Sequence, residues 1–257
     1  MTTQPTSRDG ARPGTCEFCG RELPVRTFNI PGHLPITTEM PCDCEEAMAK
    51  AKAEEDERLR EERNERFRTA WARSGVPEEY LRVTSDGSQF DTLSSGRSVY
   101  IFGPNGRGKT HLSCQMAKHY LVRSIYREDG WWHQKSLMFV EVQDVFTSLK
   151  SSWDRWDQTE EDVKSRYVGV DLLVLDDFGK GCPTEWAASQ LESIVNTRYA
   201  NGRPMIITSQ YSPQDLSKRY SGAGAGTISA IQSRLLGWCE GIRLDGPDRR
   251  LVCSDVR

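Results

Sequence analysis

The chain has 257 residues, of which 37% are hydrophobic and 28% charged, and its formal net charge is −3. This length allows one large domain or two small ones. The nearly balanced charge gives no overall signature of nucleic-acid binding, so any such contact requires a local basic patch. The first residues carry no apolar stretch, and no run approaches the roughly 18 apolar residues of a membrane helix. We therefore expect a cytoplasmic protein that is not associated with a membrane.

The N-terminal segment contains a C-x-x-C and a C-x-C pair, formed by Cys16, Cys19, Cys42 and Cys44. A piece of about 40 residues buries too little apolar surface to fold unaided. Four thiolates in so short a segment are typical of a tetrahedral zinc site, although C-x-C is a less usual pair than a second C-x-x-C. We predict a zinc-binding module over residues 1–44, with His33 as an alternative to one thiolate. The remaining cysteines are scattered and are expected to be free thiols: Cys114, Cys182, Cys239 and Cys253.

Residues 45–73 are rich in Ala and charged side chains and contain neither Gly nor Pro, which favours a helix. Opposite charges recur at i,i+3 and i,i+4 spacing. Apolar positions are too sparse for a heptad seam, so we expect a solvated connecting helix rather than a coiled coil. Phe67, Ala70 and Trp71 could dock its end onto the next domain, and the Gly and Pro that follow predict its stop. We predict a charged linker over 45–75.

Beyond this linker, short apolar runs alternate with helical stretches. The β-like runs are 99–102, 137–142, 172–175, 205–208 and 242–244, and the helical stretches are 110–125, 144–152, 184–200 and 228–239. This alternation is typical of a parallel sheet covered by helices on both faces. The sequence therefore predicts an α/β domain over 76–257, built on a five-stranded parallel sheet flanked by helices.

A complete phosphate-loop motif, G-x-x-x-x-G-K-T, follows the first of these runs and opens the first helix. Its glycines let backbone N–H groups wrap a polyphosphate, and the helix N-terminus adds its positive dipole end. Lys109 would reach the β- and γ-phosphates, and the Thr110 hydroxyl would bind Mg²⁺. The predicted ATP-binding residues here are Gly103, Pro104, Asn105, Gly106, Arg107, Gly108, Lys109, Thr110 and His111.

The run 172–175 leads into two carboxylates, Asp176 and Asp177. In a phosphate-loop ATPase the first would hold Mg²⁺ together with Thr110, and the second would polarise the attacking water. The alternative is a pair of solvated acids at a strand end. Many such enzymes carry Glu at the second position, and the shorter Asp177 would slow hydrolysis without weakening binding.

Further polar residues follow the next strand and the last helix. Gln210 comes after the run 205–208 and could sense the γ-phosphate or orient water. Arg234 could be a surface charge, or it could reach the phosphate of a neighbouring subunit as an arginine finger. Arg249 and Arg250 follow the last strand and could supply a charge within the same subunit.

Over residues 64–257 the chain resembles the AAA+ ATPases of the DnaC/DnaI helicase-loader and IstB transposition-helper group. The resemblance rests on a strand followed, in this order, by GPNGRGKT, LLVLDDFG, IITSQ, SRL and GPDRR. The resemblance implies an AAA+ core without a separate C-terminal lid. It also implies that Lys109 and Thr110 form the Walker A pair and that Asp176 and Asp177 form the Walker B pair.

The same resemblance assigns Arg234 as the arginine finger and Arg250 as the sensor-2 arginine. Gln210 stands where the group usually carries an Asn, so its longer amide must fold back to keep the same hydrogen bond. The resemblance further implies a slow, Mg²⁺-dependent ATPase that self-assembles with ATP. Its partners would be a hexameric replicative helicase, contacted by the zinc module, and single-stranded DNA.

Two other functions stay open at this point. One is an IstB-like helper that assembles on duplex DNA and recruits a transposase, and the other is a zinc-containing adaptor that binds ATP but barely hydrolyses it. The cysteine module favours the loader over the transposition helper. The adaptor stays an alternative because Asp177 stands where many such ATPases carry Glu and Gln210 stands where the group usually carries Asn.

Several aromatic residues fall in the connections around the second predicted strand: Trp131, Trp132, His133, Trp153 and Trp156. Such side chains can stack on bases, but most tryptophans pack in cores. The acidic middle of 151–166 argues against a simple phosphate track.

Overall fold

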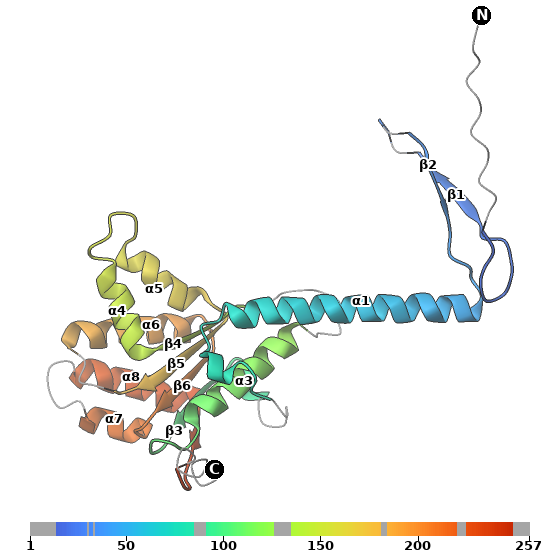
Figure 1. Ribbon diagram of the computed structural model, residues 1–257. Coiled ribbons are helices and arrows are strands. Elements are labelled where there is room, and N and C mark those ends of the chain that lie inside the picture. The colour runs from blue at the N-terminus through green and yellow to red at the C-terminus, as the bar shows by residue number, and fades with distance from the viewer. Residues whose placement is uncertain are drawn as a thin grey trace, which may run out of the picture. The chain divides into compact units, whose positions relative to one another are not determined.

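The computed structural model describes residues 14–29, 31–32, 34–84, 91–125, 135–180, 184–219 and 225–248. Its internal contacts divide the chain into two compact units, Met1–Asn64 and Glu65–Arg257 (Figure 1). No helix in the described part of the chain is long and apolar enough to cross a membrane. The division into a zinc module, a linker and an ATPase core stays a prediction.

The first unit holds a two-stranded antiparallel hairpin, formed by β1 (Val25–Phe28) and β2 (Ile36–Glu39). Every residue of both strands is exposed to solvent. An isolated hairpin of this kind is only marginally stable, because it buries little apolar surface. The unit therefore depends on other interactions for its fold, and its cysteine cluster is the obvious candidate.

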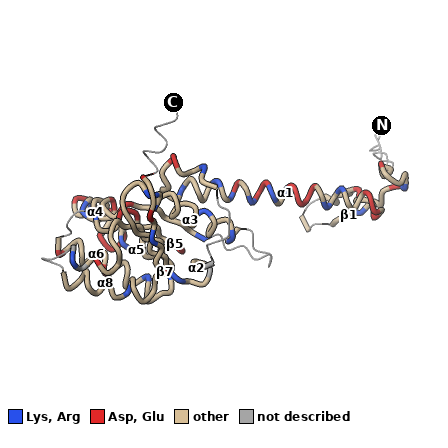
Figure 2. The backbone as a smooth tube through the Cα atoms, turned by 90° about the horizontal axis from the view of Figure 1, so that it is seen from below, with Lys and Arg blue, Asp and Glu red and all other residues tan. Residues whose placement is uncertain are grey.

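Helix α1 (Glu45–Ala72) is a single helix of 28 residues. Acidic and basic residues alternate along it (Figure 2), and Arg58 forms an i,i+3 ion pair with Glu55 at 2.7 Å. Trp71 is the one buried residue among those described in this helix. The first part of α1 is therefore held by helix propensity and charge pairing, as the sequence predicts.

The C-terminal end of α1 belongs to the second unit and packs into its core. Trp71 is 4% exposed, and Phe67 stacks on it with ring centroids 6.0 Å apart. Gly75 has φ +79°, and a Cβ there would come within 2.7 Å of the Phe139 carbonyl oxygen. Only glycine fits so close an approach at a left-handed position. The predicted docking and the predicted stop are both confirmed.

The second unit is built on a five-stranded sheet with the order β4-β5-β6-β3-β7, and every neighbouring pair is parallel. The predicted fold class is therefore confirmed. The last strand begins three residues earlier than the predicted run at 242. The strands are β3 (Ser98–Phe102), β4 (Leu137–Glu141), β5 (Leu172–Phe178), β6 (Met205–Ser209) and β7 (Cys239–Arg243).

Helices cover both faces of this sheet. Alternate residues of a strand point to opposite faces, so Leu173 and Leu175 pack in one core and Leu172 and Val174 in the other. The first core is completed by α4 to α8 and the second by α3 and the end of α1 (Figure 1). The helical elements of this unit are η1 (Glu78–Tyr80), α2 (Asp91–Ser94), α3 (Lys109–Ile125), α4 (Val142–Ser151), α5 (Glu160–Gly169), α6 (Glu185–Ala200), α7 (Pro213–Arg219) and α8 (Ala225–Trp238).

A fully buried arginine fixes the N-terminal end of β5. Arg198 donates hydrogen bonds to the carbonyl oxygens of Tyr167, Val168, Val170, Asp171 and Pro204, at 2.7–3.2 Å. Burial lowers the pKa of Arg198 to about 10, so the guanidinium stays charged at neutral pH. Five carbonyls at the end of α5 and the starts of β5 and β6 thus share one cation. The position of the strand that carries the two carboxylates follows from this contact.

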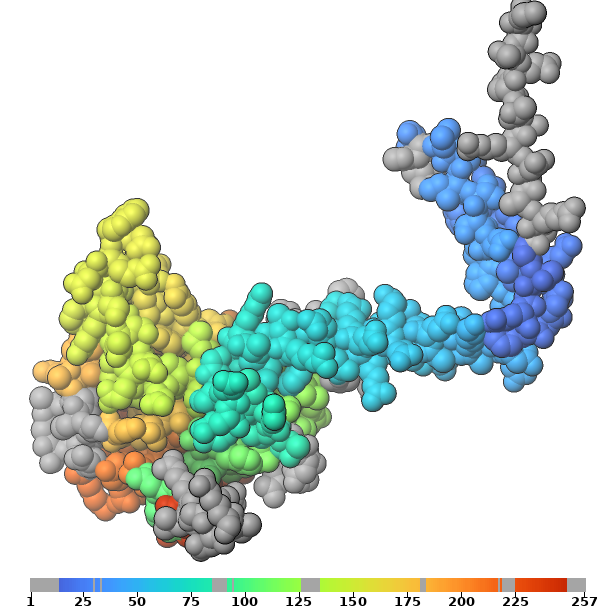
Figure 3. Space-filling model, viewed as in Figure 1, coloured from blue at the N-terminus to red at the C-terminus, as the bar shows by residue number. Residues whose placement is uncertain are grey.

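The connection between α4 and α5 projects from the surface (Figures 1 and 3). Trp156 in it is 99% exposed, and Trp153 is 59% exposed with its ring 5.1 Å from that of Trp186. Helix α5, which the sequence pattern did not predict, starts with a capping box between Thr159 and Asp162. Trp131, Trp132 and His133 lie outside the described residues.

Candidate nucleotide-binding site

The phosphate loop joins β3 to α3 and favours glycine at two of its turns. Gly103 has φ +144°, and a Cβ there would lie 2.2 Å from the Leu244 carbonyl oxygen. Gly106 has φ +73°, and a Cβ there would lie 1.8 Å from the Asp248 carboxylate. A side chain at Gly103 would require the backbone at Leu244 to move, whereas one at Gly106 would require the Asp248 side chain to move and a left-handed backbone that favours glycine. The loop is therefore a backbone cradle beside the N-terminus of α3, the arrangement that binds phosphate.

Lys109 begins α3, and its side chain lies folded over this loop. Its Nζ donates hydrogen bonds to the carbonyl oxygens of Gly103, at 3.0 Å, and Pro104, at 2.9 Å. The residue is only 7% exposed. The ammonium group is thus held at the loop mouth, where the phosphates of a nucleotide would meet it.

Thr110 and Asp176 meet across the gap between α3 and β5. The Thr110 hydroxyl lies 3.0 and 3.2 Å from the two carboxylate oxygens of Asp176. Hydroxyl and carboxylate oxygens are ligands that Mg²⁺ prefers, usually with several waters. The donor set and the glycine cradle together fit an Mg²⁺–nucleotide complex.

Thr208 on β6, which the sequence motifs did not single out, connects the two acidic residues. Its hydroxyl donates to Asp176 Oδ1 at 2.5 Å and accepts from the Asp177 backbone N–H at 3.0 Å. Burial raises the pKa of Asp176, the hydrogen bonds from Thr208 and Thr110 oppose that rise, and the neighbouring charge of Asp177 adds to it. Thr208 directly follows three apolar residues in the strand next to the acidic one, and this position is the signal that could have revealed it.

Asp177 adopts a backbone conformation that is uncommon for a residue with a side chain. Its φ is +55°, and the pairing of β5 with β6 shifts register between Leu175 and Phe178. Its carboxylate, 29% exposed, forms an ion pair with Lys180 at 3.0 Å. Strained backbone of this kind concentrates at functional sites, and here it turns Asp177 toward open space while Asp176 stays buried.

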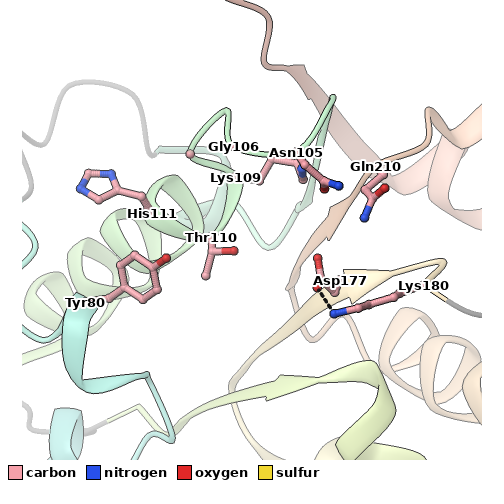
Figure 4. A pocket seen from close by; sticks show the side chains of 10 residues that line it. Tyr80, Asn105, Gly106, Lys109, Thr110, His111, Asp177, Lys180 and Gln210 are labelled. Carbon is pink, nitrogen blue, oxygen red and sulfur yellow. Dashed lines mark hydrogen bonds and ion pairs between the residues drawn. The ribbon is translucent and has the colours of Figure 1, made fainter. Parts of the chain in front are cut away.

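A cavity of about 610 Å³ lies in front of these residues. This volume is within the range of small-molecule sites. Figure 4 shows Tyr80 and His111 toward one end of the cavity and Asp177, Lys180 and Gln210 toward the other, with the phosphate loop between them. The lining residues are Tyr80, Asn105, Gly106, Gly108, Lys109, Thr110, His111, Asp177, Lys180 and Gln210.

Most of the predicted ATP-site residues are thus brought together, but Arg234 is not among them. Arg234 lies on α8, where it donates to the Ala230 carbonyl oxygen at 2.9 Å and lies 4.0 Å from Glu192. It does not line the cavity, so it stays a predicted arginine finger for a neighbouring subunit. Arg250 lies outside the described residues. Tyr80 and Lys180 are lining residues that the motifs did not indicate.

The four N-terminal cysteines form a second candidate site, because their sulfur atoms all lie within 4.8 Å of one another. Cys16 and Cys44 are 3.7 Å apart, and Cys19 and Cys42 are 3.5 Å apart. Zn–S bonds of about 2.3 Å in a tetrahedron place sulfurs about 3.8 Å apart, so the cluster fits zinc. Hydrogen bonds from the backbone and side chain of Arg21 lower the pKa of Cys19 to about 6, whereas the pKa of Cys42 is raised and that of Cys44 is raised to about 12. Without metal the thiolate is therefore favoured at Cys19, and zinc binding would have to release protons from the other thiols. His33 lies outside the described residues, whereas Cys114 and Cys239 are free thiols.

We predict that Asp176→Asn stabilises the nucleotide-free protein and removes the Mg²⁺-dependent stabilisation of the protein by ATP. Because the folded pKa of Asp176 lies above the ordinary 3.8, ionisation costs stability as the pH rises from that value through the folded pKa. The amide should therefore raise the free energy of unfolding at pH 8. Denaturant unfolding at several pH values measures this.

The gain from Asp176→Asn should disappear as the pH falls below the folded pKa. Asp245→Asn, which removes an exposed carboxylate, is the control. A variant that is less stable than the parent at pH 8, or that keeps Mg²⁺-dependent stabilisation by ATP, would contradict the assignment of Asp176.

We also predict about one zinc ion per chain, bound by the four N-terminal thiolates. Metal analysis of freshly purified protein should show it, and Cys42→Ser combined with Cys44→Ser should lose it. Cys239→Ser, which changes a thiol outside the cluster, should keep it. Zinc-free wild-type protein, or full retention in the double variant, would refute the site.

The sequence and fold are similar to those of known proteins. Residues 81–254 match the family described as IstB-like ATP binding protein. The replicative helicase loader DnaC of Escherichia coli K12 is 25% identical over 177 residues, 62% of this chain and 68% of its own. A protein in an insertion sequence of Mycobacterium tuberculosis is 28% identical over 160 residues, 62% of this chain and 57% of its own.

Solved structures agree on the fold. A crystal structure of DnaI superposes with a TM-score of 0.51 at 21% identity, covering 66% of this chain and 94% of that one. Domain III of the Thermotoga maritima replication initiation protein DnaA superposes with a TM-score of 0.50 at 19% identity, covering 70% of this chain and 72% of that one. The family match spans more than half of the chain and includes the acidic strand. This chain therefore belongs to the IstB-like ATP-binding proteins and has an AAA+ fold.

Proposed function

We propose that this protein is an ATP-dependent helicase loader, which engages a hexameric replicative helicase and places it on single-stranded DNA. The observation that carries the proposal is the nucleotide site, assembled in a chain similar to the helicase loader DnaC over 62% of its length. The four-thiol cluster of the N-terminal unit supports the loader over the transposition helper, because it supplies a separate module for partner contact.

In this proposal the site hydrolyses ATP slowly. Lys109 and the loop amides bind the β- and γ-phosphates, and Thr110 with Asp176 holds the metal. Bound Mg²⁺ would neutralise the developing phosphate charge. Asp177 orients the water whose oxygen forms a new bond to the γ-phosphorus while the bond to the β-phosphate oxygen breaks. Gln210 contacts the γ-phosphate from the neighbouring strand. The ATP-bound protein self-assembles, so that Arg234 of one subunit reaches the nucleotide of the next.

A transposition helper that assembles on duplex DNA is the second candidate, and the relative found in an insertion sequence favours it. An adaptor that barely hydrolyses ATP is the third. The Asp177–Lys180 ion pair, 3.0 Å long, favours this third candidate because it occupies the carboxylate that hydrolysis requires.

The test is co-elution of the full-length protein with the replicative helicase of its host or replicon, with and without ATP. We expect a complex that forms with the wild type and is lost with Cys42→Ser plus Cys44→Ser, since the N-terminal unit makes the contact. Lys109→Ala should weaken ATP binding by at least about tenfold, because a charge-assisted contact is lost, and the helicase should no longer be released onto single-stranded DNA.

A protein that ignores the helicase but coats duplex DNA in the presence of ATP would move the transposition helper ahead. A helicase complex that is unaffected by loss of the zinc cluster would overturn the role of the N-terminal unit.

A further inference from the structure

A second lysine, Lys180, lies in the nucleotide cavity outside the phosphate loop. Its Nζ is 3.0 Å from Asp177 Oδ2, and both side chains line the cavity (Figure 4). The sequence motifs predict roles for Asp177 but none for a cation beside it. The residue proposed to act on water is therefore already paired with a positive charge on the same wall.

The backbone of Lys180 is held by hydrogen bonds on both sides, whereas its side chain is held by the ion pair with Asp177 and is otherwise exposed. Its N–H donates to the Asp177 carbonyl oxygen at 3.2 Å, and its own carbonyl oxygen accepts from Gln143 Nε2 at 2.9 Å. The side chain is 56% exposed. A lysine ammonium on a flexible four-carbon stem can change partners without a backbone shift.

A bound triphosphate would compete with Asp177 for this ammonium. In the proposed function the loop and Lys109 hold the β-phosphate region and Asp177 faces the γ-phosphate, so the terminal phosphate would lie at the end of the cavity lined by Asp177, Lys180 and Gln210 (Figure 4). An exposed ion pair between single charges is weak, and a γ-phosphate carries more charge than one carboxylate. A diphosphate has no group at this position and leaves the pair undisturbed.

We propose that Lys180 is a further contact to the γ-phosphate, one that exists only with ATP and so adds to the preference of this site for ATP over ADP. It pairs with Asp177 in the nucleotide-free protein and with the γ-phosphate once ATP is bound, and this exchange frees Asp177 to orient water. The inference rests on the ATP binding proposed above and adds to it a residue that contacts the third phosphate.

The test compares the affinities of ATP and ADP for the full-length protein, using fluorescent analogues of both. Lys180→Met should weaken ATP binding by about tenfold or more, the usual range for a charge-assisted contact, and should leave ADP binding within about twofold. Lys180→Arg should keep most of the preference for ATP. Lys218→Met is the matched control, because Lys218 forms the same i,i+3 ion pair with Asp215, at 3.1 Å, outside the cavity.

A second comparison separates phosphate binding from simple neutralisation of Asp177. In an Asp177→Asn background the carboxylate charge is gone, yet Lys180→Met should still weaken ATP binding selectively. A loss that disappears in this background, or an equal loss for ADP, would overturn the proposal. If wild type and Lys109→Ala bind ATP equally, the nucleotide site itself fails and the Lys180 proposal falls with it.

Discussion

The Thr208 hydroxyl, buried at the C-terminal end of β6, donates to the Asp176 carboxylate and accepts from the Asp177 backbone N–H. Two neighbouring residues on β5 are thereby given different environments. One carboxylate stays buried beside the Thr110 hydroxyl, and the other turns outward through a left-handed backbone conformation. A metal-binding role and a water-orienting role require this separation. The rest of the second unit keeps β5 and β6 in the register that allows it.

That register has supports at both ends of β5. At its start, Arg198 donates hydrogen bonds to five carbonyl oxygens at the end of α5 and directly before β5 and β6. At its end, Ser209 Oγ donates to the Phe178 carbonyl oxygen at 2.6 Å. On the other side of the site, β7 pairs with β3 and brings Leu244 against the phosphate loop, where only glycine fits. Strands on both sides of the site are therefore fixed before any nucleotide enters.

Much of this arrangement follows from the sequence. The loop motif is local, and the C-terminal ends of parallel strands meet at one edge of a sheet, so the proximity of Thr110 to Asp176 is predictable. The cysteine cluster is predictable for the same local reason, since two short pairs are enough to indicate it. The family resemblance rests on these same local motifs.

Other features depend on tertiary register and could not be predicted in this way. The roles of Thr208 and Lys180 depend on which strand neighbours β5 and on a register shift near Asp177. The β1–β2 hairpin buries neither face, so its sequence lacks the alternation of apolar and polar residues that would predict strands. Strand β7 starts at Cys239, before the apolar residues that suggested a strand, because its pairing with β3 extends over Glu240 and Gly241.

The central claim is that Thr208 sets the metal-binding state of Asp176, and the Mg²⁺ dependence of ATP binding in Thr208→Val tests it most directly. Without the hydroxyl, Asp176 loses a hydrogen bond that favours its ionised form. The variant should therefore need more Mg²⁺, by about tenfold, and most strongly at low pH. Nucleotide binding without Mg²⁺ should be unchanged, and Thr208→Ser should restore the wild-type response. An identical Mg²⁺ dependence in Thr208→Val and wild type at every pH would contradict the account.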